Sequence, residues 1–245
     1  MPGIPLIRKG DDLVALTIDA LERSEYEPRD QDVFVFSQKI VSKAEDRYVD
    51  LASITPSHQA EELAAKTEKD PRLVEVVLSQ SRRVLKFRKH VLITVHKLGF
   101  VMANAGVDRS NLKSGTADFV LLLPDDPDRT CLDIKQRLDN YYGTGVGVLI
   151  CDSVGRPWRN GTVGLALGCA GLPGVRDLRG NPDLYGRPLE ASQVGYADQI
   201  AAAANLVMGE AEEGQPLVVA RGLRWNEAGQ SVRQTLRAEE LDLFL

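Results

Sequence analysis

The longest run without a charged side chain covers residues 160–175, and this run limits the folds open to the chain. Glycines and a proline interrupt it, and it is shorter than the ~20 apolar residues that a helix needs to cross a bilayer. We therefore interpret it as glycine-rich backbone buried inside a soluble protein. Residues 1–10 show no charged-then-apolar signal pattern, so we expect a cytoplasmic protein with no membrane partner.

Composition excludes several classes of protein. The 245 residues carry 30 basic and 35 acidic side chains and no lysine- or arginine-rich run, which argues against a nucleic-acid partner. The three cysteines lack a CxxC spacing, which argues against a disulfide scaffold and a structural zinc site. Because no linker marks a domain boundary, we expect residues 1–245 to form a single unit, with room for two intimately associated lobes.

Apolar periodicity and capping residues predict the secondary structure. Asp11 or Asp12 can cap a first helix, and Thr55-Pro56 and Asp70-Pro71 each place a capping oxygen before a proline. Helices and strands do not alternate regularly, so we predict an α+β fold with mixed and antiparallel sheets and packed helices. The predicted helices cover residues 13–21, 56–66, 71–80, 131–142, 196–210 and a short stretch near 238. The predicted strands cover residues 33–36 continued by 37–43, then 84–87, 91–96, 119–123, 146–151 and 217–220.

Common nucleotide and nucleophile motifs are missing from the sequence. There is no G-x4-GK[ST] phosphate loop, no GxGxxG after a strand and no GxSxG elbow, and no cysteine has an obvious histidine partner. If phosphates bind here, isolated cations, backbone amides and metal ions must hold them.

Four oxygen-bearing side chains stand where a metal ion could bind them. Asp108 lies in a polar loop, and Asp152 and Ser153 follow a predicted strand. Glu210 ends a predicted helix, where the helix dipole favours a cation. Hard oxygen ligands from separate segments suit Mg²⁺ or Mn²⁺. The structural alternative for each is that a loop aspartate forms a turn and a terminal glutamate is solvated.

Basic side chains offer candidate anion contacts. If residues 37–43 form a strand, alternation places Lys39 and Lys43 on one face, where both could point into a cleft; a solvated strand edge is the alternative. Arg156 and Arg159 could bind phosphate or carboxylate, or form surface ion pairs. We interpret the histidines and an acidic turn as structural: His58, His90, His96, Asp125, Asp126 and Asp128.

Several motifs in one order and spacing closely resemble the coenzyme F420:L-glutamate ligase family, also called F420-0:gamma-glutamyl ligases. The resemblance covers essentially the whole chain. The motifs lie at residues 3–7, 9–13, 40–45, 104–108, 152–156, 183–189 and 205–210. Two positions depart from the usual pattern: Asp46 and Ala211 stand where the family more often has glycine.

The resemblance implies a GTP-dependent enzyme that adds L-glutamate to the F420-0 precursor through its α-amine, and then a further glutamate by a γ-linkage. It also implies two divalent cations (Mg²⁺ or Mn²⁺), potassium (K⁺), and an intertwined homodimer with sites near its interface. The implied metal ligands are Asp108, Asp152, Ser153 and Glu210. The implied GTP contacts are Ile4, Pro5, Leu6, Ile7, Gln38, Lys39, Lys43, Asn111, Met208, Gly209, Glu210, Ala211, Glu212, Glu213, Gly214 and Gln215.

The implied chemistry fits the absence of a nucleophile. Transfer of a phosphoryl group from GTP to a carboxylate gives an acyl phosphate that the amine of glutamate can attack, and this transfer depends on positioning and charge neutralisation. In this hypothesis Asp152 holds metal beside the phosphates and Lys43 neutralises developing charge. The alternatives are a metal-dependent GTP hydrolase or nucleotidyl transferase, and a non-catalytic nucleotide- or deazaflavin-binding module.

Overall fold

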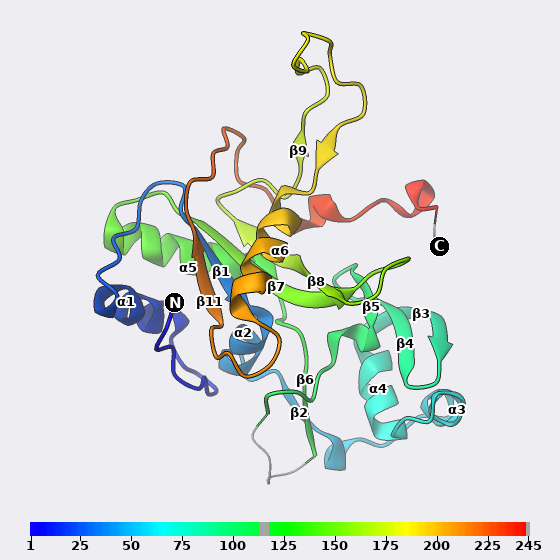
Figure 1. The fold of residues 1–245 in the computed structure, drawn as a ribbon. Coiled ribbons are helices and arrows are strands. Elements are labelled where there is room, and N and C mark those ends of the chain that lie inside the picture. Colours follow the sequence, from blue (N-terminus) through cyan, green and yellow to red (C-terminus); the bar gives the residue numbers. More distant parts are fainter. Residues whose placement is uncertain (113–117, 244–245) are drawn as a thin grey trace.

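A computed structural model describes residues 1–112 and 118–243 of the chain (Figure 1). Within these ranges, no helix combines the length and the apolar character needed to cross a membrane. The helices are α1 (Leu13–Arg23), α2 (Gln38–Ala44), α3 (His58–Thr67), α4 (Pro71–Ser79), α5 (Pro127–Tyr142) and α6 (Tyr196–Met208). The strands are β1 (Val33–Ser37), β2 (Tyr48–Asp50), β3 (Ser81–Arg88), β4 (Val91–His96), β5 (Val101–Ala103), β6 (Phe119–Leu121), β7 (Gly147–Gly155), β8 (Thr162–Ala170), β9 (Arg176–Asp177), β10 (Gln193–Val194) and β11 (Leu217–Ala220).

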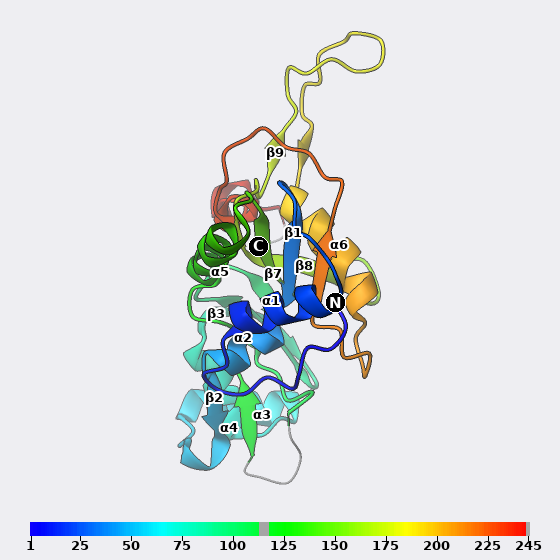
Figure 2. The ribbon, with the colours of Figure 1, turned by 90° about the vertical axis from the view of Figure 1, so that its left-hand side faces the viewer.

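A four-stranded mixed sheet in the order β11-β1-β7-β8 forms the centre of the fold. β1 runs parallel to β7 and antiparallel to β11, and β7 and β8 form an antiparallel pair. Helices α5 and α6 cover opposite faces of this sheet (Figure 2). Because both faces are covered, residues 33–36 of β1 are all apolar and buried, instead of alternating between apolar and polar.

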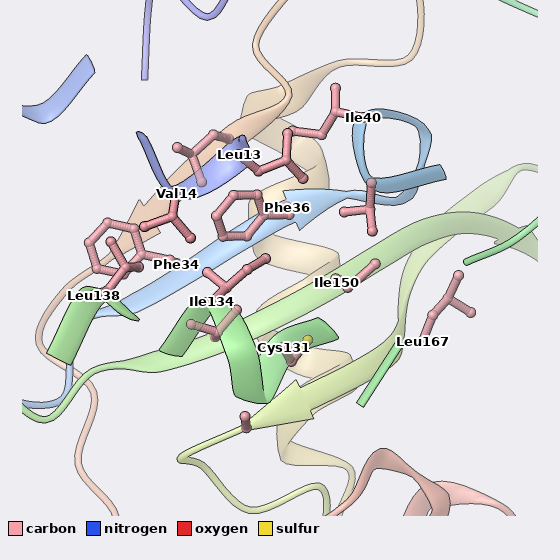
Figure 3. Close-up of a cluster of buried hydrophobic side chains, with 14 of the residues drawn as sticks. Leu13, Val14, Phe34, Phe36, Ile40, Cys131, Ile134, Leu138, Ile150 and Leu167 are labelled. Carbon is pink, nitrogen blue, oxygen red and sulfur yellow. The ribbon is translucent and has the colours of Figure 1, made fainter. Parts of the chain in front are cut away.

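The two faces of the central sheet have separate cores. Phe34 and Phe36 of β1 point to the face that α1 and α5 cover, where they meet Leu13, Ile134 and Leu138 (Figure 3). The intervening side chains of β1 point to the opposite face and pack against α6. Successive side chains of the short strand β1 therefore point alternately into the two cores, one on each side of the sheet.

Smaller sheets complete the fold and confirm the predicted α+β class. The antiparallel sheet β3-β4-β5 packs with α3 and α4, and β2 pairs with β6. The short pair β9-β10 is the base of a long hairpin that projects away from the rest of the molecule (Figure 1). The expectations of two lobes and of a dimer stay predictions.

Several predicted elements agree with the structure. Asp12 caps α1 by accepting hydrogen bonds from the amides of residues 14 and 15, and α4 begins at Pro71 behind the cap Asp70. β4 and β11 have the predicted bounds. The glycine-rich run at residues 160–175 contains β8, whose residues are mostly buried.

Other predictions were wrong in local structure. Residues 38–44 form helix α2, not a continuation of β1, because the chain leaves the sheet at Ser37 and buries Ile40 and Val41 in one helical turn. The helix predicted after Thr55-Pro56 begins later, with Ser57 as its cap. β7 continues to Gly155, so Asp152 and Ser153 lie within the strand and not beyond it.

The acidic turn has a larger structural role than predicted. Asp126 caps α5, which therefore begins at Pro127, four residues before the predicted start. The carboxylate of Asp128 accepts hydrogen bonds from the amide of Cys169 at 2.9 Å and the hydroxyl of Ser231 at 2.5 Å. It ties the first turn of α5 to β8 and to the C-terminal segment.

Close approach between β8 and α6 requires a glycine at position 164. A Cβ atom there would overlap the carbonyl group of Ala201 and would lie 2.8 Å from Cβ of Asn205, both on α6. A Cβ atom added at Gly155 of β7 would instead have no atom within 4 Å beyond its own residue and its chain neighbours. The absence of a side chain at Gly164 therefore sets how closely α6 lies against the sheet.

We expect Gly164→Ala to lower the free energy of unfolding by about 1–3 kcal/mol, because α6 must move away from β8. The matched variant Gly155→Ala should change it by less than about 0.5 kcal/mol. Urea denaturation followed by circular dichroism measures both. Equal effects of the two variants would contradict a packing role specific to Gly164.

Candidate functional site

A pocket of about 320 Å³ lies where the chain leaves β1 and where β7 passes the end of α6. The parallel pairing of β1 and β7 aligns Ser37 with Cys151, so the segments that follow these residues lie side by side. The lining residues come from five parts of the chain: Ile4, Pro5, Leu6 and Ile7; Ser37, Lys39, Ile40 and Lys43; Asn111; Cys151, Asp152 and Ser153; and Asn205 with residues 208–216.

The pocket wall formed by β7 carries a carboxylate with few partners. One oxygen of Asp152 accepts a hydrogen bond from the amide of Ser153 at 2.9 Å. Burial raises the pKa of Asp152 to about 6, and the negative charges of Asp108 and Glu210 add to this rise, while Lys39 opposes it. A carboxylate in this position is ionised near neutral pH at an electrostatic cost that a bound cation would remove.

Helix α2 supplies two ammonium groups to the same pocket. Lys39 and Lys43 are one helical turn apart, so they share a face of α2, although the strand predicted for them is absent. The Nζ atom of Lys43 donates a hydrogen bond to the carbonyl oxygen of Asn111 at 2.8 Å. Burial and the nearby charge of Lys39 lower the pKa of Lys43. Of the two alternatives left open by the sequence, a shared cleft agrees with this lining better than a solvated strand edge, and the reason is a helical turn.

Lys39, which lines the pocket, forms an ion pair with Asp108, with Nζ 2.6 Å from Oδ2. Asp108 is fixed by its backbone, which pairs with Leu121, and by hydrogen bonds from the amide and hydroxyl of Ser110. Burial alone would lower the pKa of Lys39, but Asp108, Asp152 and Glu210 outweigh it and raise the pKa. Lys39 is therefore held in its charged form by three carboxylates.

The loop after α6 also lines the pocket. Glu210 lies two residues beyond the end of α6, and its carboxylate accepts a hydrogen bond from the Asn205 side-chain amide at 2.6 Å. Gly209 adopts φ +75°, and a Cβ atom there would overlap the carboxylate of Glu213. That carboxylate accepts a hydrogen bond from the amide of Ala211 at 2.8 Å. The loop is thus folded tightly over the end of the helix.

The donor set fits a hard divalent cation. Asp108, Asp152 and Glu210 all interact with the Lys39 ammonium, Ser153 adds a hydroxyl beside Asp152, and every one of these donors is an oxygen. Within residues 1–112 and 118–243, no three acidic, histidine or cysteine side chains already stand close enough together to hold a metal. The carboxylates would therefore have to draw together around the ion.

The pocket brings together almost every residue that the sequence suggested for nucleotide binding. Gln38 is the exception, because its side chain is buried and donates hydrogen bonds to the Ser42 hydroxyl and the Leu122 carbonyl oxygen. Asp108 is not part of the lining and reaches the site through Lys39. Lining residues that sequence reasoning missed are Ser37, Ile40, Cys151, Asn205 and Pro216.

The remaining candidates lie outside the pocket. Arg156 donates a hydrogen bond to the carbonyl oxygen of Gly161 in the turn between β7 and β8, and neither Arg156 nor Arg159 lines the pocket. His96 is buried, and burial lowers its pKa to about 4, which agrees with a structural role.

Asp46 has a backbone conformation that glycine adopts readily, which agrees with the glycine that the family resemblance implies at its position. Its φ is +56°, in the left-handed region, where aspartate is tolerated better than most side chains. Its carboxylate lies 2.5 Å from Nζ of Lys9. Ala211 has no such conformation, so alanine replaces glycine there without backbone strain.

Comparisons with known proteins agree with the motifs in this pocket. The chain is 43% identical over 244 residues to the coenzyme F420:L-glutamate ligase of Methanothermobacter thermautotrophicus, covering 99% of this chain and 96% of that protein. It is 43% identical over 243 residues to the protein of the same name from Archaeoglobus fulgidus, covering 99% and 93%. It is 39% identical over 241 residues to the protein of the same name from Methanocaldococcus jannaschii, covering 98% of this chain and 94% of that protein.

The sequence model of one protein family, described as F420-0:Gamma-glutamyl ligase, matches residues 3–222, which include every segment that lines the pocket. The match and the relatives agree over nearly the full length of the chain. The chain therefore belongs to the F420-0:gamma-glutamyl ligase family.

Proposed function

We propose that this protein is a ligase of coenzyme F420 biosynthesis that uses GTP to join L-glutamate to F420-0, and then adds a further glutamate by a γ-linkage. The names of the relatives support glutamate ligation. The observation that carries the GTP-dependent part is the pocket itself, which is lined by Asp152, Glu210 and two lysines, and which Asp108 adjoins through its ion pair with Lys39.

The charge pattern of the pocket suits phosphoryl transfer to a carboxylate. A carboxylate is a poor electrophile, so the γ-phosphoryl group of GTP moves first to the carboxylate oxygen of F420-0, giving an acyl phosphate and GDP. The α-amine of glutamate then attacks the acyl carbon, loses a proton and expels phosphate as the amide bond forms. Such transfer needs positioning and charge neutralisation rather than a protein nucleophile.

Each group in the pocket has a role in this proposal. Asp108, Asp152, Ser153 and Glu210 would hold two divalent ions, Mg²⁺ or Mn²⁺, and the proposal includes one K⁺ ion. Bound divalent ions supply positive charge that offsets the charge of the phosphates. Lys43 projects from α2 toward the same space and would neutralise charge on the transferred group.

The walls of the pocket would enclose the nucleotide. Residues 4–7 and residues 208–215 both line the pocket. The glycines at 209 and 214 have positive φ, which allows the tight turns of the second segment. These segments would supply the contacts that a phosphate loop supplies in other nucleotide-binding proteins.

The projecting hairpin supports a homodimer. Leu184 and Tyr185, near its tip, are 99% and 87% exposed. Large apolar side chains so fully in contact with water are typical of an interaction surface when they gather on one element. We propose that a second copy of the chain covers them in the homodimer that the family resemblance implies.

Asp152→Asn should reduce GDP release at least ~100-fold, because the amide cannot supply the charge that holds a divalent ion beside the phosphates. The assay incubates purified protein with F420-0, L-glutamate, GTP and Mn²⁺, and mass spectrometry records GDP and glutamate-sized increments. Asp19→Asn, an exposed change on α1, is the control and should retain activity.

The same assay separates the alternatives. Full activity of Asp152→Asn would remove this residue from the site. GDP formation by the wild-type protein without glutamate would instead indicate a GTP hydrolase, and a nucleotidyl transferase would release pyrophosphate. Saturable nucleotide binding with no product would indicate a binding module.

Asp152→Asn should also stabilise the protein above pH 6 in the absence of divalent metal. The pKa of Asp152 is raised to about 6 in the folded protein, so the folded state binds its proton at a pH where the unfolded state does not. The stability cost of the charge is therefore absent below about pH 4, develops from pH 4 to 6 and is complete above pH 6.

We expect a gain of about 1–2 kcal/mol at pH 7.5, allowing for the partial contact of this side chain with solvent, and no gain at pH 4. Urea denaturation in EDTA at both pH values measures it. A variant that is less stable than wild type at pH 7.5 would contradict the conclusion that the charge of Asp152 destabilises the folded protein.

Light scattering should give a mass about twice the 26.9 kDa of one chain. The double variant Leu184→Ser, Tyr185→Ser should shift the mass toward 26.9 kDa, because it removes the apolar contacts of the hairpin tip. An unchanged dimer in the variant would show that the hairpin is not the contact, and a monomeric wild type would contradict the dimer.

A further inference from the structure

The ammonium group of Lys39 lies among three carboxylates that come from three separate segments. It pairs directly with Asp108, and its charge interacts with Asp152 on β7 and Glu210 after α6. Both members of the Lys39–Asp108 pair are largely withdrawn from solvent. Asp152 and Glu210 line the pocket and Asp108 lies beside it, so their negative charges repel one another, and the charge of Lys39 acts against this repulsion.

The neighbouring lysine does not share this role. Lys43 lines the same pocket but donates to a backbone carbonyl, and among the carboxylates only Asp108 acts on its charge. Burial and the charge of Lys39 outweigh the effect of Asp108, so the pKa of Lys43 is lowered. The pKa of Lys39 is raised. The two ammonium groups of one helix face are therefore electrostatically distinct.

A divalent ion bound by these carboxylates would compete with Lys39 for the same oxygens. Oδ2 of Asp108 is 2.6 Å from Nζ of Lys39, and a metal ligated by that oxygen would bring two cations into contact. Their repulsion is relieved if the lysine side chain rotates away. Because Lys39 also lines the pocket beside Lys43, an anionic phosphate there offers its ammonium group a new partner.

We propose that Lys39 is an internal counter-cation of the site, which a divalent metal ion must displace from Asp108 and which then pairs with the phosphates of the nucleotide. This inference rests on the proposed function, because it takes the carboxylates as metal ligands. It makes Lys39 a coupling element: the metal frees the lysine for the nucleotide, and the nucleotide draws the lysine away from the metal site. By linkage, each ligand then strengthens the binding of the other.

Removal of the Lys39 charge should therefore tighten metal binding in the absence of nucleotide. We expect Lys39→Met to bind Mn²⁺ at least about tenfold more tightly than wild type, since a unit charge within a few ångströms of the ion is removed. Lys39→Arg, which keeps the charge, should bind no more tightly than wild type. Lys9→Met, which removes a charge at an exposed ion pair with Asp46, controls for net charge and should stay within about twofold.

Electron paramagnetic resonance of free Mn²⁺ measures these affinities directly, with no need for activity. The titrations are repeated with a non-hydrolysable GTP analogue, which should raise the Mn²⁺ affinity of wild type by a larger factor than that of Lys39→Met. Circular dichroism confirms folding, and Lys39→Gln serves as a second neutral variant if Lys39→Met does not fold.

The outcomes separate this inference from the proposed function. If wild type binds Mn²⁺ and the neutral variants bind it equally or more weakly, Lys39 is not a competing cation, and the ligase proposal is unaffected. If wild type binds no Mn²⁺ with or without the analogue, the metal site fails, and the inference fails with it.

Discussion

Burial of β1 and β7 on both faces is the constraint on which the rest of the structure depends. Two layers of helices cover these parallel strands, so residues 33–36 of β1 and 147–151 of β7 are buried, and the half-buried polar residues Asp152 and Ser153 come only in the last part of β7. The carboxyl ends of adjacent parallel strands meet at one edge of a sheet, where open α/β sheets also bind ligands. Here that edge brings the start of α2 beside Asp152.

Charge balance is the second principle of the pocket. Asp152 is a poorly partnered carboxylate whose pKa is raised by burial, and Lys39 is a lysine whose pKa is raised by acidic neighbours in spite of burial. The charge of Asp152 is therefore held at an electrostatic cost, whereas the charge of Lys39 is favoured by its acidic neighbours. Polar groups held at an electrostatic cost in a pocket are typical of functional sites, where the ligand and not the fold removes the cost.

Packing of α6 connects the fold to this site. Gly164 allows the helix to lie against β8, and Asn205 on the same helix donates to Glu210 in the loop that follows. The position of Glu210 therefore depends on a glycine in a strand that does not line the pocket. This dependence shows why the glycine-rich run matters, although none of its residues is an aspartate, glutamate, lysine or arginine.

The sequence by itself determined the α+β class, most helix and strand positions, and the residue types of the site, because periodicity, caps and motif order are local properties of the chain. It did not determine that residues 38–44 are helical, that Gln38 is buried, or that Asp128 ties α5 to the C-terminal segment. Only the tertiary structure decided these points, and it also decided that Lys39 faces Asp108 rather than solvent. The physical reason is that burial and electrostatic partners come from segments distant in sequence, which no local pattern records.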